Sequence, residues 1–182
     1  MVMKKASLLS PSFLPPHLFT LHDYASGVAV WEAASAAGVP FSKNGQPMVG
    51  FLSAPGTAGF MGVRWWLALI GEMEKHLQHP CFHILDCGES PGYAMAAAGL
   101  QQRIVLQGDS AGTRAVKRFY EEAGGHVFII RPPSFDLIPS LSVTTHLAAY
   151  FTRSYCQGRV PDLNSPEAKP EEGFPNDAYP PG

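Results

Sequence analysis

The sequence predicts an α/β fold: a small, mostly parallel sheet of about four strands, with helices on both faces and flexible proline-rich termini. Two observations lead to this class. Short, almost continuously apolar runs alternate with patterns of helical period, as expected for parallel strands buried beneath helices. The chain has 182 residues, 46% of them hydrophobic, which is enough for one core and too few for two ordinary domains.

The prolines divide the chain into three parts. Residues 1–21 are expected to form a proline-rich arm, because prolines interrupt its apolar stretch before it reaches the length of a signal peptide. Residues 22–157 are expected to form a single α/β domain. Residues 158–182 contain six prolines among acidic and small residues, and this tail is expected to be disordered.

The first half of the domain is expected to contain two helices and one strand. Asp23 can cap a helix that ends near Ala37, before Gly38. The apolar run at 48–52 predicts a buried strand. A second helix is expected over 60–78, where apolar residues recur at helical spacing until a proline ends the pattern.

The second half continues the alternation. Ser90 followed by Pro91 predicts a helix start, because it combines a capping hydroxyl with a proline at the first helical position. Asp109 or Ser110 can cap the next helix. The expected strands are 81–85, 103–107 and 126–130, and the expected helices are 92–100, the helix that follows Ser110, and 138–156.

Charge and cysteine content exclude several classes of function. The net charge is −2 and the charged residues, 15% of the chain, are scattered, so we expect no binding to nucleic acid or to a membrane surface. Three cysteines without C-x-x-C pairing indicate neither disulfides nor a zinc site, and they fit a reducing cytoplasm. We therefore expect a cytoplasmic protein without a metal or cofactor, and the low charge favours a homo-oligomer.

Three consecutive strand-to-helix turns, 53–59, 86–92 and 108–112, gather small and polar residues. Ligands of open parallel sheets bind outside the carboxyl ends of the strands, where helix N-termini favour anions. Arg131 adds a cation at the end of the fourth strand, so the predicted ligand is a small anionic metabolite. The candidate ligand-binding residues are Ser53, Gly56, Thr57, Asp86, Cys87, Glu89, Ser90, Asp109, Ser110 and Arg131.

Other interpretations of these residues stay open. Tight turns need glycine, proline and capping hydroxyls whatever the function. Arg131 can instead form a salt bridge with Asp86 or Asp109. These two carboxylates can pair for acid–base chemistry or for binding a divalent metal, assisted by Glu89. Cys87 can be a nucleophile or a buried structural cysteine.

The segment Gly108-Asp109-Ser110-Ala111-Gly112 has the G-x-S-x-G pattern between a strand and a helix. It resembles the nucleophile elbow of α/β-hydrolase esterases, and the resemblance implies that Ser110 is the nucleophile. The acid and base would then be Asp136 and His146. The H-G-G-G type of oxyanion segment is missing upstream.

The order of three turn motifs carries a second resemblance. S-A-P-G begins at Ser53, L-D-C-G-x-x-P-G at Leu85 and P-P-x-x-D-L at Pro132. This order resembles an uncharacterised family of short bacterial α/β proteins, covers the middle of the chain and implies no activity.

Two functions from different classes follow from the sequence. The first is the binding of an anionic small molecule at the carboxyl edge of the sheet. The second is a non-catalytic interaction module that oligomerises through its alanine-rich and aromatic helices. At least one of Trp65 and Trp66 belongs to the core, and an outward-facing tryptophan would mark a partner surface.

Overall fold

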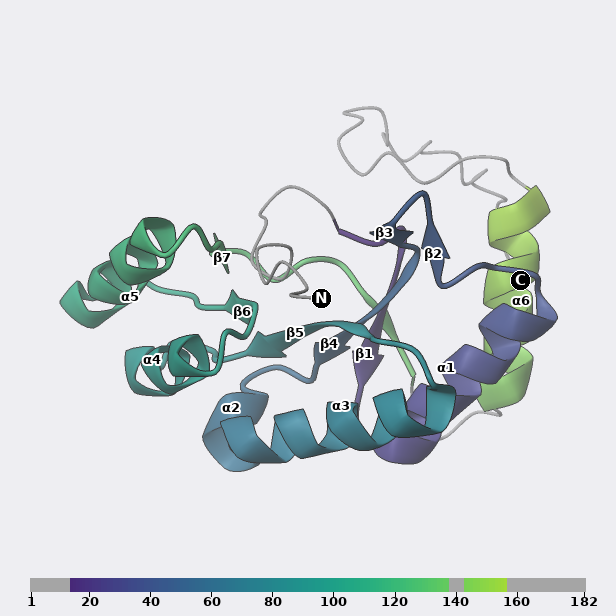
Figure 1. Ribbon diagram of the computed structural model, residues 1–182, viewed down its shortest axis with the longest axis horizontal. Helices are drawn as coiled ribbons and strands as arrows, with labels where there is room; N and C mark the ends of the chain where they lie inside the picture. Colours follow the sequence, from purple (N-terminus) through teal and green to yellow (C-terminus); the bar gives the residue numbers. More distant parts are fainter. Residues whose placement is uncertain (1–13, 138–142, 157–182) are drawn as a thin grey trace, which may run out of the picture.

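The computed structural model describes residues 14–137 and 143–156. Its main sheet has six parallel strands in the order β7-β6-β5-β4-β1-β8 (Figure 1). The strands are β1 (His17–Leu21), β4 (Val49–Ser53), β5 (Phe82–Asp86), β6 (Ile104–Val105), β7 (Val127–Phe128) and β8 (Phe135–Asp136). The predicted α/β class with a mostly parallel sheet is confirmed, and the strand count of about four is corrected to six. The predicted tail, 158–182, and most of the predicted arm lie outside the described residues.

The two strands that the sequence analysis missed are neighbours. β1, which was expected to be part of the arm 1–21, pairs with β4 on one side and with β8 on the other. It follows Pro15 and Pro16 directly, and β8 has only two residues and follows two prolines. Prolines are typical of loops and are rare within central strands, so the segments that follow them were not predicted as strands.

The long helices lie close to their expected positions. They are α1 (Tyr24–Ala36), α3 (Val63–Leu77), α4 (Pro91–Gly99), α5 (Ala111–Glu122) and α6 (Val143–Cys156); a short α2 (Thr57–Phe60) and a hairpin of β2 (Ser42–Lys43) and β3 (Gln46–Pro47) complete the described elements. Gly62, with a φ of 90°, separates α2 from α3 where one helix was expected. Asp23 caps α1 as predicted, whereas the Ser90 hydroxyl makes no capping hydrogen bond.

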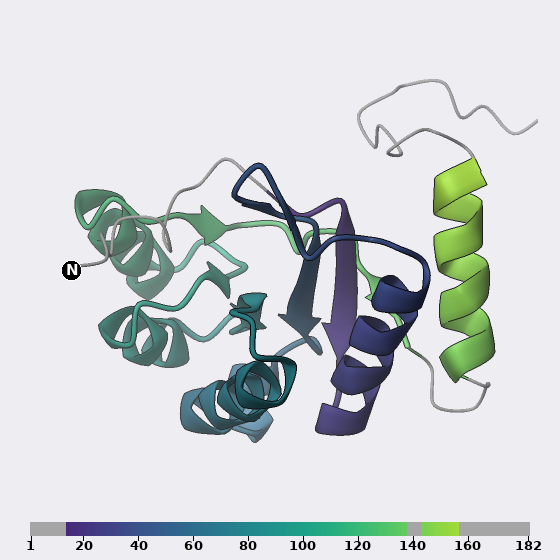
Figure 2. The same cartoon turned by 45° about the vertical axis from the view of Figure 1, so that its right-hand side comes forward.

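The helices cover one face of the sheet. β1, β4, β5, β6 and β7 follow one another in space as in sequence, so right-handed crossovers bring α1, α3, α4 and α5 to the same side. Figures 1 and 2 show these helices and α6 in an arc along that side. The core on this face contains buried residues from all five helices. A second, separate cluster of buried residues consists of strand residues alone. Among the described residues, the prediction of helices on both faces is therefore corrected.

We call the opposite side of the sheet the helix-free face. Leu18, Leu52, Phe82, Ile84 and Val105 form its buried cluster. The register explains this grouping, because Leu52 pairs with Ile84 and the side chains of a strand alternate between its two faces.

The connection from β7 to β8 crosses this face. Five strand spacings of about 4.8 Å amount to about 24 Å, and the seven steps along the chain from Phe128 to Phe135, extended at about 3.4 Å each, span the same distance. The crossing segment (Ile129–Ser134) must therefore run nearly straight, and Pro132 and Pro133 favour such an extended form. Figures 1 and 2 show the chain leaving β7 and passing across the strands.

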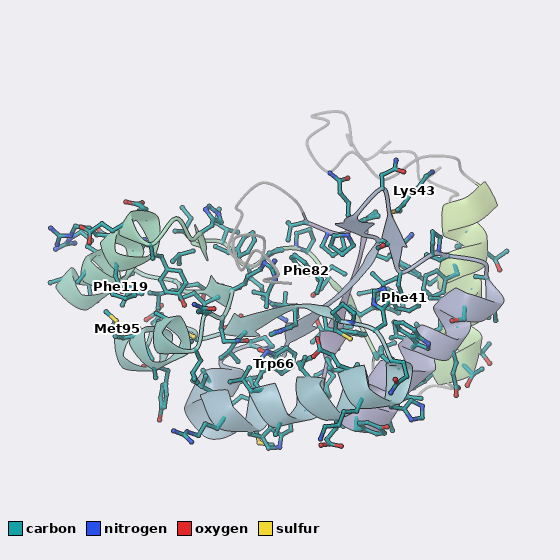
Figure 3. All side chains as sticks on the ribbon, viewed as in Figure 1. Phe41, Lys43, Trp66, Phe82, Met95 and Phe119 are labelled. Atoms are coloured by element: carbon teal, nitrogen blue, oxygen red, sulfur yellow. The ribbon has the colours of Figure 1, made fainter. Side chains whose placement is uncertain are left out.

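Trp66 is the largest fully buried side chain of the helix-covered core. It points from α3 toward the sheet (Figure 3), and its indole Nε1–H donates a hydrogen bond of 3.3 Å to Nδ1 of His83. His83 thus packs against the core through Trp66. The described residues contain no cluster of three or more His, Cys, Asp or Glu that could hold a metal ion.

The half-buried imidazole of His83 gives folding a pH dependence. Burial lowers its pKa to about 4, with a further contribution from the positive charge of Arg103, so the unfolded chain binds this proton more tightly than the folded chain. The free energy of unfolding is then unaffected by this group above about pH 6.5 and falls by about 3 kcal/mol between pH 6.5 and 4.

We expect His83→Gln to reduce the pH dependence of stability in that window; the contribution of His17, whose pKa is also lowered by burial, remains. Urea denaturation of wild type and variant at several pH values between 4 and 7 measures the slope. The exposed His76→Gln is the matched control and should keep the wild-type slope. Equal slopes for wild type and His83→Gln would contradict the assignment.

None of the helices in the described residues combines the length and the apolar character needed to cross a membrane.

Candidate functional site

Asp86 joins two of the predicted turns at the carboxyl edge of the sheet. Its carboxylate is almost fully buried, and Oδ1 accepts hydrogen bonds from the backbone N–H groups of Gly56, at 2.9 Å, and Gly88, at 2.8 Å. Its own N–H donates to Oγ of Ser53 at 2.8 Å. Gly56 and Gly88 have φ values of 67° and 56°, the left-handed conformation that turns both N–H groups inward.

Arg131 completes this cluster from the crossing segment. Its Nη1 donates to Oδ2 of Asp86 at 2.6 Å, and Nη2 donates to the carbonyl of Ser53 at 2.8 Å and to Oγ1 of Thr20 at 3.3 Å. The side chains of Arg131 and Asp86 are 20% and 3% exposed. The sequence allowed Arg131 to form a salt bridge with either Asp86 or Asp109, and the structure contains the one with Asp86.

This arrangement uses the donors that an external anion would need. The N–H groups of Gly56 and Gly88 and the guanidinium of Arg131 all bind the carboxylate of Asp86. Asp86 thus occupies the position of a bound anion, and a ligand at this point would have to displace it.

The other predicted site residues divide by exposure. Ser53 and Thr57 are buried, and the Thr57 hydroxyl donates to the carbonyl of Ala54 at 2.7 Å. Glu89 and Asp109 are exposed, and Oδ2 of Asp109 lies 3.3 Å from Nη1 of Arg114. The structure therefore brings Ser53, Gly56, Asp86 and Arg131 into one cluster, and it leaves the Asp109 carboxylate in solvent and out of it.

Cys87 belongs to the core. It is 2% exposed and packs in the helix-covered cluster. Burial raises the pKa of its thiol to about 12, and the neighbouring Asp86 adds to the shift. The thiol is therefore protonated at neutral pH and inaccessible, which agrees with a structural cysteine.

The residues of the hydrolase resemblance are not assembled. Ser110 caps α5, where its Oγ accepts from the N–H of Thr113 at 3.1 Å. Asp136 lies on β8, four strands from β6 in the sheet order, and its Oδ1 bonds to Nε2 of His22 rather than to His146. Four strand spacings amount to about 19 Å, so Ser110 and Asp136 cannot act on the same bond.

A second group of polar residues lies at the carboxyl ends of β1 and β8. His22 follows β1, and its Nε2 lies 2.7 Å from Oδ1 of Asp136, the last residue of β8. Beside them is a hollow of about 320 Å³, which we call the β1–β8 hollow. It is lined by His22, Asp23, Ala25, Ser26, Ala29, Leu137 and Val143.

The topology explains why polar groups meet here. The strand order runs from β1 toward β7 and then reverses, because β8 returns to the other side of β1. In open α/β sheets, ligands bind outside the carboxyl ends of strands at such a reversal. Asp23 also fixes the start of α1, since its Oδ1 accepts from the N–H of Ser26 at 2.7 Å.

The chemistry of the β1–β8 hollow follows from its hydrogen bonds. A carboxylate accepts hydrogen bonds and donates none, so Nε2 of His22 is the donor to Asp136. The neutral imidazole then has its lone pair on Nδ1. With Asp23 and Asp136 close by, the hollow offers acceptors and negative charge.

Searches of protein-family models, curated proteins and solved structures found no match to this chain.

Proposed function

We propose that the protein binds a small organic amine or amino alcohol in the β1–β8 hollow. The observation that carries the proposal is the His22–Asp136 hydrogen bond beside a hollow at the strand-order reversal. The volume of about 320 Å³ lies at the lower end of the range for small-molecule pockets, roughly 300–1,000 Å³.

The composition of the hollow supports this class of ligand. Ala25, Ala29, Leu137 and Val143 provide an apolar wall for a short carbon chain. An ammonium or hydroxyl group on that chain can donate to Nδ1 of His22 or to a carboxylate. An anionic ligand, as expected from the sequence, is less favoured, because Asp23 lines the hollow, Asp136 is bound to the lining residue His22, and Asp86 already holds Arg131.

The test compares two ligands that share an isopropyl group, have similar size and carry opposite charge, isobutylamine and isobutyrate. Saturation-transfer NMR and the melting temperature of the full chain measure binding. We expect isobutylamine to bind and isobutyrate to bind at least about tenfold more weakly, a difference of roughly 1.4 kcal/mol. Preferred binding of isobutyrate, or no binding of either, would contradict the proposal.

The Asp136→Asn variant locates the site. It preserves the shape of the side chain and removes its charge, so the affinity for isobutylamine should fall by about tenfold. Asp109→Asn is the matched control, because it neutralises an exposed carboxylate at the same edge of the sheet, four strands away. Equal affinity in wild type and Asp136→Asn would place the amine elsewhere.

A further inference from the structure

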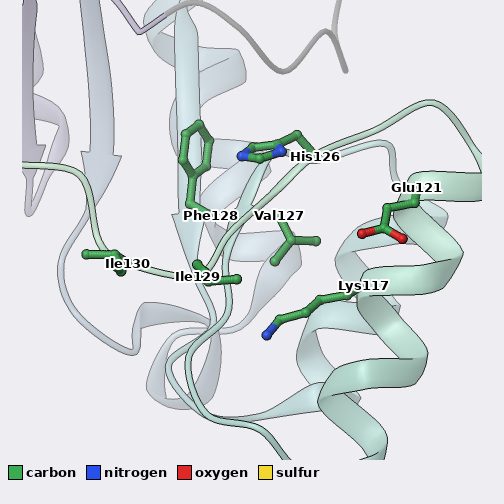
Figure 4. Close-up of a pocket in the computed structure, with 7 residues that line it drawn as sticks. All are labelled: Lys117, Glu121, His126, Val127, Phe128, Ile129 and Ile130. Carbon is green, nitrogen blue, oxygen red and sulfur yellow. The ribbon is translucent and has the colours of Figure 1, made fainter.

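β7 is an edge strand with a hollow beside it. In the described sheet it pairs with β6 alone. A hollow of about 370 Å³ lies between the open side of β7 and α5; we call it the β7 hollow. Figure 4 shows Lys117 and Glu121 directed from α5 toward the chain of β7.

The open side of β7 carries backbone groups that can pair. The carbonyl of Phe128 accepts from the N–H of Leu106, so Phe128 turns its backbone groups toward β6. Successive residues of a strand direct these groups to opposite sides, and the N–H and C=O of Val127 therefore lie on the open side. Such an edge is a template for a further strand.

Large apolar side chains continue this edge. Ile129 is 57% exposed and Ile130 is 77% exposed, and both line the β7 hollow. Two consecutive exposed isoleucines beside an unpaired strand form an apolar surface that a partner chain would cover. Ile130 is also the most exposed of the large hydrophobic residues in the described part of the chain.

The charges on α5 favour a second copy of this chain as the partner that covers the edge of β7. Two edges related by a two-fold axis perpendicular to the sheet pair antiparallel and bring the two α5 helices side by side. Because a helix between neighbouring strands lies over the gap between them, the two axes would be about 10 Å apart, a normal packing distance. Lys117 and Glu121 are one turn apart on the same side, so each lysine can meet the glutamate of the mate.

We propose that two copies associate through β7 and form one continuous sheet across the interface. Val127 supplies the backbone pairing, Ile129 and Ile130 are covered by the mate, and Lys117 pairs with Glu121 across the axis. This dimer does not depend on a ligand in the β1–β8 hollow, which lies at the other edge of the sheet.

A charge-swap experiment on the full chain tests this interface. Sedimentation velocity should show a dimer for wild type. Lys117→Glu places glutamates opposite glutamates and Glu121→Lys places lysines opposite lysines, so each variant alone should dimerise at least about tenfold more weakly. An equimolar mixture of the two variants restores both pairs, and native mass spectrometry should detect the heterodimer.

Ile130→Lys is the second variant, and it should also weaken the dimer without loss of the fold, because this side chain is mostly exposed. Circular dichroism checks the fold of each variant. A monomeric wild type would overturn the proposal and leave the edge to a different partner. A wild-type dimer that survives in all three variants, or a variant mixture that stays monomeric, would overturn it as well.

Discussion

Replacing Arg131 with methionine is expected to lower the free energy of unfolding by about 3–5 kcal/mol, because the variant leaves the buried carboxylate of Asp86 without its counter-charge. Methionine has a similar length and keeps the packing of the crossing segment. The backbone N–H groups of Gly56 and Gly88 still bind Asp86, but they carry only partial charges. Urea denaturation followed by circular dichroism measures the change.

Two further variants separate the ion pair from general damage. Arg114→Met removes the exposed pair with Asp109 and should change stability by less than about 1 kcal/mol. The double variant Asp86→Asn/Arg131→Met should be more stable than Arg131→Met alone, since the amide oxygen of the introduced asparagine would still accept the two N–H bonds and no unpaired charge remains. A double variant that is no more stable than Arg131→Met would refute the role of the charge.

Trp66→Ala is expected to destabilise the protein by about 3–5 kcal/mol. The substitution opens a cavity in the helix-covered core, where Trp66 is fully buried, and it removes the hydrogen bond to His83. Thermal and urea unfolding of the purified variant measure the loss. Trp66→Phe should fall between wild type and alanine, because it keeps most of the ring and lacks the N–H.

The neighbouring tryptophan provides the control. Trp65 is half-buried at the margin of the same core. Trp65→Ala should therefore lower the free energy of unfolding by less than half as much as Trp66→Ala. If the two alanine variants are equally stable, Trp66 is not the central side chain of the core.

The elements that the sequence predicted well have strong local signals. Asp23 before an apolar-periodic segment indicated the start of α1, and the apolar run that ends at Leu85 indicated β5 within one residue. The break at Gly62 was missed, because one glycine inside a helical pattern is usually tolerated. Strand β8 depends on its pairing with β1, and β1 pairs mainly with β4; both pairings are long-range properties that no local pattern contains.

The candidate site was predicted in part for the same reason. The cluster around Asp86 and Arg131 was anticipated because both residues follow strands that were recognised, and the salt bridge between them was one of the stated alternatives. The His22–Asp136 pair was missed because each residue lies at the end of a strand that was missed. A histidine directly after the mostly apolar residues 18–21 was the available signal, and it needed β1 to be recognised first.

The position of β1 has a consequence for the order in which the chain folds. β1 is the first strand of the described chain to be synthesised, and one of its two neighbours, β8, is the last. Phe19 of β1 pairs with Phe135 of β8, and this pairing closes a loop of more than a hundred residues that contains every other strand of the main sheet. Contacts this distant in sequence slow folding. On the ribosome, β1 therefore remains an open edge until the crossing segment has emerged, and the docking of β8 is the step that completes the sheet.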